Sequence, residues 1–114
     1  MVNNSAGLDA IFAALGDPTR RRIVERLAGG RLSVGELASE FAMSQPAVSK
    51  HIKVLERSGL LERDVEGRVH RCRLDPDAMA AAAGWLDTQR RFWEAAFGRL
   101  DDYFARTPTP ERKQ

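Results

Sequence analysis

The chain has 114 residues, 43% of them hydrophobic and 30% charged, which fits one compact domain and leaves little room for a second. No apolar run approaches the roughly 20 residues that cross a bilayer, and the first residues lack the basic start and apolar run of a signal peptide, so we expect a cytoplasmic protein without a membrane partner. The net charge is +2, and the single cysteine, Cys72, excludes a disulfide framework and any site built from several thiolates of one chain.

The first predicted helix covers residues 8–15 and follows an N-terminus, residues 1–6, that we expect to be flexible. One face of this helix is apolar at helical spacing, and its residues are Leu8, Ile11, Phe12 and Leu15. Gly16 then ends the helix. The pattern therefore predicts a short amphipathic helix.

A second helix is predicted over residues 18–28. Asp17 is suited to the N-cap and Pro18 to the first helical position, and a glycine pair at 29 and 30 ends the helix. Arg20 lies in the first turn, where the positive end of the helix dipole disfavours a cation. A nearby phosphate would offset this cost, so Arg20 is a candidate DNA contact.

The third predicted helix, over residues 34–41, begins at a capping box. Ser33 and Glu36 have the S-x-x-E spacing in which each side chain satisfies a backbone amide of the first turn. A connection of a few residues then leads into the next helix. Two helices joined in this way predict a helix-turn-helix.

The fourth predicted helix, over residues 45–58, has one apolar face and one face suited to DNA. Ser44 is a good N-cap, and Gly59 can adopt the left-handed conformation that ends a helix. The apolar face consists of Val48, Ile52 and Leu55. The opposite face carries Gln45, Ser49, Lys50 and Lys53. Glutamine can bridge an adenine edge, serine can donate or accept, and lysine can reach guanine or phosphate. The alternative is an amphipathic helix whose polar face meets only water.

A β-hairpin, or wing, is predicted over residues 60–74 with its turn at Glu66 and Gly67. Neither face of its second strand is cleanly apolar, so we expect a marginal, mostly exposed hairpin that leans on the helices. Arg68 beside the turn is a candidate contact to the DNA backbone or minor groove, and an ordinary solvated hairpin is the alternative. Cys72 is expected to pack beside Leu74 as an inert thiol, although a redox role is left open.

The last predicted helix covers residues 76–105, and Gly84 is a position where it could bend or break. One apolar stripe along it consists of Leu86, Trp93, Phe97, Leu100 and Phe104, and a second, adjacent stripe of Trp85, Phe92, Ala96 and Tyr103. This surface is too large for one small monomer to bury, which favours a two-fold dimer interface. Residues 107–114 are expected to form a flexible tail.

Taken together, these motifs resemble the ArsR family of winged-helix repressors. The resemblance rests on ALGDPTRRRIVERL, the SVGELA capping box, MSQPAVSKHIKVLERSGLLE and the EGRVHRCRLDP wing, and it extends from Leu8 to Phe104. The terminal GWLDTQRRFWEAAFGRLDDYF resembles the SdpR-like subgroup. The resemblance implies a bacterial winged helix-turn-helix protein, mostly α with a small β-hairpin. Such a protein binds double-stranded operator DNA as a homodimer and represses transcription, commonly of its own operon.

The resemblance also implies roles for particular residues. It puts Gln45, Ser49 and Lys50 at the base edges, and Lys53 and Arg68 near the backbone. The first and last helices would form the dimer interface, through Leu8, Phe12, Trp93, Phe97, Leu100 and Phe104. Pairing two copies would place their 45–58 helices one DNA turn apart, on the order of 10 bp, so a pseudo-palindromic operator is expected.

The chain departs from the metal sensors of this family. Those carry a cysteine pair in the helix that reads VGELASEF here, or paired Asp/His ligands in the last helix, and this chain has neither. His51, His70 and Cys72 do not supply the set of about four N/S ligands that a structural zinc site needs. We therefore expect no metal and no cofactor, and no feature of the sequence identifies an inducer, the operator or the regulated genes.

Charge placement bears on the choice between functions. Residues 17–31 hold five arginines and two acids, and residues 43–73 hold seven Lys/Arg and four acids, giving +3 in each, whereas residues 74–105 hold three arginines and six acids, giving −3. A positively charged part of the chain suits a phosphate backbone.

The alternative function is a winged-helix module that holds proteins together without binding DNA. In such a module the polar and basic residues of the 45–58 helix would have no reason to gather on one face. An enzyme is not expected, because there is no Gly-rich phosphate cradle and no Ser/His/Asp set.

Overall fold

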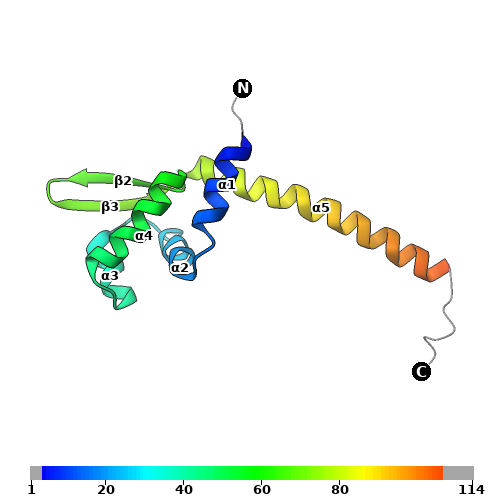
Figure 1. The fold of residues 1–114 in the computed structure, drawn as a ribbon, viewed down its shortest axis with the longest axis horizontal. Helices are drawn as coiled ribbons and strands as arrows, with labels where there is room; N and C mark the ends of the chain where they lie inside the picture. Colours follow the sequence, from blue (N-terminus) through cyan, green and yellow to red (C-terminus); the bar gives the residue numbers. More distant parts are fainter. Residues whose placement is uncertain (1–3, 107–114) are drawn as a thin grey trace. The chain divides into compact units, whose positions relative to one another are not determined.

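The computed structural model of the protein describes residues 4–106 and is mostly helical, with a small antiparallel sheet (Figure 1). Its helices are α1 (Asn4–Ala14), α2 (Pro18–Leu27), α3 (Val34–Phe41), α4 (Gln45–Ser58) and α5 (Pro76–Arg106). Its strands are β1 (Leu32–Ser33), β2 (Leu61–Glu66) and β3 (Val69–Leu74). The predicted winged helix-turn-helix fold is confirmed. Among the described residues, no helix combines the length and apolar character that crossing a bilayer would require.

The helix bounds follow the predicted ones except at the start of the chain. α3 and α4 run over the predicted residues, and α2 and α5 differ from the prediction by one residue at their C-terminal ends. α1 spans 4–14 instead of 8–15, so the helix begins within the segment that was predicted to be a flexible N-terminus. Apolar spacing marks only the buried part of a helix, which is why it missed this first turn. Residues 1–3 and the predicted tail, 107–114, lie outside the described residues.

Side-chain caps account for the starts of α2 and α3. The Asp17 carboxylate accepts a 3.1 Å hydrogen bond from the Arg20 amide. At α3, the Ser33 hydroxyl accepts from the Glu36 amide at 3.0 Å, and the Glu36 carboxylate accepts from the Ser33 amide at 2.8 Å. Both halves of the predicted capping box are therefore present.

The turn of the helix-turn-helix lies at Ala42, which adopts a left-handed conformation with φ of 54°. A residue with a side chain loses roughly 1–2 kcal/mol in this region relative to glycine or to ordinary helical backbone. Two backbone hydrogen bonds offset this cost: the Ala42 amide donates to Ser39 at 3.4 Å, and the Met43 amide donates to Ala38 at 3.2 Å. The chain thus reverses direction sharply and enters α4.

The sheet contains one strand that the sequence did not predict. β3 pairs antiparallel with both β2 and the two-residue β1, so the strand order is β1-β3-β2. Leu32 lies opposite Cys72 in the first pairing, and Arg63 lies opposite Cys72 in the second. The wing is therefore attached at its base to the residues that lead into α3.

The chain divides into two compact units, residues 1–82 and 83–114, which we describe separately. The core of the first unit is made by one face from each of α1 to α4 together with the base of the wing. Its completely buried residues are Ile23, Leu37, Val48, Ile52, Leu55, Leu60 and Cys72. The hairpin is thus less exposed than predicted at its base, because Cys72 packs into this core beside the half-buried Leu74.

The described part of the second unit is the remainder of α5, which continues without a break through Gly84. Ion pairs at helical spacing support it: Arg90 contacts Asp87 at 2.6 Å and Glu94 at 3.0 Å. The large apolar residues along this segment are at least 45% exposed, and they are Trp85, Leu86, Phe92, Trp93, Phe97, Leu100, Tyr103 and Phe104.

Candidate nucleic-acid interface

The polar face of α4 is held outward by the packing of its opposite face. Val48, Ile52 and Leu55 are completely buried in the core. The Ser44 hydroxyl accepts a 3.3 Å hydrogen bond from the Ala47 amide, which defines where the helix begins. The predicted DNA contacts on this helix are exposed or half-buried, and they are Gln45, Ser49, Lys50 and Lys53.

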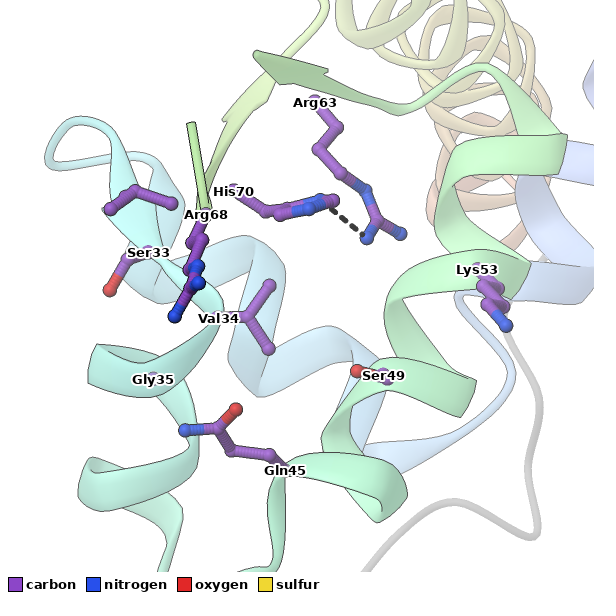
Figure 2. A pocket seen from close by; sticks show the side chains of 10 residues that line it. Ser33, Val34, Gly35, Gln45, Ser49, Lys53, Arg63, Arg68 and His70 are labelled. Carbon is purple, nitrogen blue, oxygen red and sulfur yellow. Dashed lines mark hydrogen bonds between the residues drawn. The ribbon is translucent and has the colours of Figure 1, made fainter. Parts of the chain in front are cut away.

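A groove of about 520 Å³ lies between α4, the first turn of α3 and the wing (Figure 2). Four of the predicted DNA contacts line it: Gln45, Ser49, Lys53 and Arg68. Three of these come from α4 and one from the tip of the wing, so the fold brings distant parts of the sequence to one surface. Lys50 and Arg20 are not among the lining residues.

The rest of the lining was not predicted as a contact surface, and it consists of Ser33, Val34, Gly35, Arg63, Val69 and His70. Figure 2 shows Gln45 reaching from α4 toward Gly35 at the start of α3. A Cβ atom at position 35 would lie 3.4 Å from Nε2 of Gln45, an ordinary van der Waals distance, so the first turn of α3 and this amide lie side by side. The capping box located the start of α3, but no sequence signal indicated that this turn faces Gln45.

Three of the predicted DNA-contacting cations have no partner in the described part of the chain. Lys50, Lys53 and Arg68 make no hydrogen bond or ion pair with any of residues 4–106. Arg71 on the same hairpin differs, because its Nε lies 3.2 Å from the Glu66 carboxylate. An unpaired cation keeps its full charge for a phosphate group, and neutralising phosphates is the main source of affinity for DNA.

The outer face of the wing is neutralised by its own acids. Arg73 contacts Glu62 and, at 3.1 Å, Asp64, and the Asp64 hydrogen bond is the main reason that the pKa of Arg73 is raised. Arg31 also lies 3.5 Å from Asp64. Arg68 is the arginine of the hairpin that was predicted to contact DNA. Arg71 and Arg73 pair with acids of the hairpin, whereas Arg68 makes no hydrogen bond or ion pair with residues 4–106.

Arg20 has partners within the first unit. Its Nε donates to the Ala14 carbonyl at 2.6 Å, and one Nη lies 3.5 Å from Nδ1 of His51. His51 is about one quarter exposed and lies 3.8 Å from the Asp17 carboxylate. Arg20 thus joins the end of α1 to α4, and its predicted contact with DNA stays a prediction.

The residues predicted for dimerisation fall in both units. In the first, Leu8 and Phe12 are half-buried, and Phe12 packs against the edge of the core. In the second, Trp93, Phe97, Leu100 and Phe104 are each at least 50% exposed. The ring centroids of Trp93 and Phe97 lie 5.7 Å apart, so these side chains form a continuous aromatic surface.

The residues with metal-binding or redox chemistry are dispersed. In the described part of the chain, no three His, Cys, Asp or Glu residues are grouped so that they could hold a metal ion. Cys72 is completely buried, and this burial raises the pKa of its thiol above the ordinary value. A thiol with a raised pKa is a poor nucleophile at neutral pH.

Comparison with known proteins identifies relatives over most of the chain. Residues 15–64 match a family described as a helix-turn-helix domain. The HTH-type transcriptional regulator Rv2034 of Mycobacterium tuberculosis is 48% identical over 88 residues, which is 77% of this chain and 79% of the relative. The transcriptional repressor SdpR of Bacillus subtilis is 28% identical over 69% of this chain and 88% of its own. The crystal structure of an ArsR family transcriptional regulator, RHA00566, is 40% identical, with a TM-score of 0.72 over 82% of this chain and 97% of that one.

Proposed function

The chain belongs to the ArsR family of winged helix-turn-helix transcriptional regulators, and we propose that it acts as a homodimeric repressor on a pseudo-palindromic operator. The observation that supports this proposal most is the groove between α4 and the wing. It gathers Gln45, Ser49, Lys53 and Arg68, and the two cations among them make no hydrogen bond or ion pair with residues 4–106. The place of action would be the cytoplasm.

The proposed division of labour follows from side-chain chemistry. Gln45, Ser49 and Lys50 would read base edges, because they stand on the first two turns of α4, where a recognition helix enters the major groove. Lys53 lies one turn further along and would contact phosphate. Arg68 at the tip of the wing would contact the backbone or the minor groove.

The dimer would be formed by α1 and α5 of two copies. In α5, Leu86, Trp93, Phe97, Leu100 and Phe104 recur at spacings of seven, four, three and four residues. This is the spacing of a helix–helix seam, and an exposed seam of this size needs a partner helix. A two-fold dimer would present two α4 helices to successive major grooves, about 34 Å apart.

The test is selection of bound sequences from a random double-stranded DNA pool with the full-length protein at near-physiological salt. We expect enrichment of an inverted repeat whose half-sites are separated by about one helical turn, on the order of 10 bp. Parallel selections with a chelator and with a thiol oxidant report whether a metal or Cys72 affects binding. Enrichment of no sequence would contradict the repressor and favour the alternative of a winged-helix module that binds only proteins.

A further inference from the structure

One arginine of the wing is half-buried in the lining of the groove and contacts two other elements. Arg63 lies on β2, and its side chain is 15% exposed. Its Nη2 donates a 2.8 Å hydrogen bond to the Glu56 carboxylate on α4. Its Nη1 lies 3.2 Å from Nδ1 of His70 on β3, and Figure 2 shows this contact inside the groove. A single guanidinium therefore joins the recognition helix to both strands of the wing.

The chemistry of these contacts fixes their direction. An arginine is always protonated in proteins, so Arg63 donates and Nδ1 of His70 accepts. Nε of Arg63 is buried and has no hydrogen-bond partner in the described part of the chain. The two Nη contacts consequently hold the guanidinium. Lysine has no planar fork with which to make both contacts at once.

The position of Arg63 along the wing matters as much as its partners. On the inner face of the hairpin, Leu61 and Cys72 are buried at the base. Further along the same face, Val65 opposite His70 is 58% exposed. Arg63 lies between the packed base and this exposed end. Beyond it, the tip that carries Arg68 has little apolar packing to set its direction.

We propose that Arg63 is a positioning residue for DNA binding, which holds the wing at the angle to α4 at which Arg68 and the recognition helix reach the same duplex. This inference rests on the proposed function. Arg63 acts through Glu56 and His70 and is largely shielded from solvent, so its effect on affinity passes through Arg68. Loss of Arg63 leaves the fold intact at its base but releases the outer half of the wing.

The test is a double-mutant cycle measured by fluorescence anisotropy on the selected operator. We expect Arg68→Ala to weaken binding about tenfold in the parent protein, as the loss of a backbone contact does, and less than about twofold when combined with Arg63→Met. Arg71→Met is the matched control, because it removes the same charge and an ion pair from the outer face of the same hairpin. In that background Arg68→Ala should keep its full effect. If Arg68→Ala lowers operator affinity equally in the parent, Arg63→Met and Arg71→Met proteins, the inference is overturned.

A second readout needs no DNA. Amide hydrogen exchange over residues 63–70 should speed up at least about tenfold in Arg63→Met and not in Arg71→Met, while the buried amides of α4 stay protected. If Arg63→Met fails to fold, Glu56→Ala removes the anchor of Arg63 on α4 and should give the same exchange pattern. Unchanged exchange in the wing would overturn the inference even if the protein binds DNA. A changed wing in a protein that binds no operator would instead refute the proposed function and leave Arg63 as the anchor of the wing.

Discussion

Nε of Arg20 donates a 2.6 Å hydrogen bond to the carbonyl oxygen of Ala14, the last residue of α1. The Arg20 Nη2 lies 3.4 Å from the Ala13 carbonyl, which also accepts from the Gly16 amide at 3.1 Å, so one guanidinium contacts the last two carbonyls of α1. Arg20→Ala should therefore lower the free energy of unfolding by about 1–3 kcal/mol, the usual range for losing hydrogen bonds to a charged group. Urea titration of the purified protein measures this.

Arg57→Ala is the control for Arg20, because it removes an equal charge from a side chain without a hydrogen bond or ion pair to residues 4–106. The same variants separate the structural role of Arg20 from its predicted contact with DNA. An Arg20→Ala protein of parent stability, whose operator affinity has become less dependent on salt, would favour the DNA contact instead.

Lys53→Ala and Gln45→Ala should weaken operator binding in different ways. Lys53→Ala removes a cation and should lower affinity for all sequences alike, and it should reduce the slope of log affinity against log salt by about 1. Gln45→Ala removes a group that can recognise one base, so it should relax preference at one position by about 1–3 kcal/mol and leave the salt slope unchanged. Titrations on matched and scrambled operators distinguish the two effects. Identical behaviour of both variants would contradict the proposed division of labour.

Trp93→Glu or Phe97→Glu should produce a folded monomer with poor operator affinity. Either substitution places a charge in the proposed α5 seam, where pairing with a second copy would bury it without a partner. Ala95→Glu is the control, because position 95 is exposed on the opposite side of the helix from this seam. Sedimentation velocity measures the mass. A dimer that survives both seam substitutions would exclude these residues from the interface.

The parts of the fold that the sequence predicted are those whose signals are local. Ser44 and Gly59 mark the ends of α4 because an N-cap hydroxyl and a left-handed glycine act on their own helix. The partners of Arg20 and Arg63 were not predictable, since they depend on how helices and strands that are distant in sequence pack. β1 has only two residues, so its pairing opposite Cys72 leaves no alternating pattern of apolar and polar residues in the sequence. For the same reason the groove itself was not predicted, although four of the residues that line it were.

Cys72 should react with a thiol reagent only when the protein opens. It is completely buried, and desolvation raises the pKa of its thiol, so little reactive thiolate is present at neutral pH. Labelling by a chromogenic disulfide should be slow in buffer and should accelerate with urea in parallel with unfolding. Operator affinity should be unaffected by mild oxidant. Rapid labelling of the native protein would show that the wing opens readily and would favour a redox role for Cys72.

The Asp17 carboxylate should make part of the stability of the protein dependent on acid pH. The pKa of Asp17 is lowered from its ordinary value of 3.8, chiefly by the hydrogen bond from the Arg20 amide, and nearby His51 and Arg20 lower it further. Because the folded-state pKa lies below the unfolded one, the stabilisation is fully present above about pH 4 and is lost as the pH falls through the lowered pKa. Asp17→Asn keeps a capping oxygen but no charge, so its unfolding midpoint in urea should lie below that of the parent at pH 7 and should converge with it once the pH falls below the lowered pKa. Glu25→Gln controls for the loss of one negative charge from α2, since Glu25 is exposed and forms no hydrogen bond or ion pair within residues 4–106. A constant gap between Asp17→Asn and the parent from pH 7 to pH 2 would show that the charge of Asp17 does not stabilise the fold.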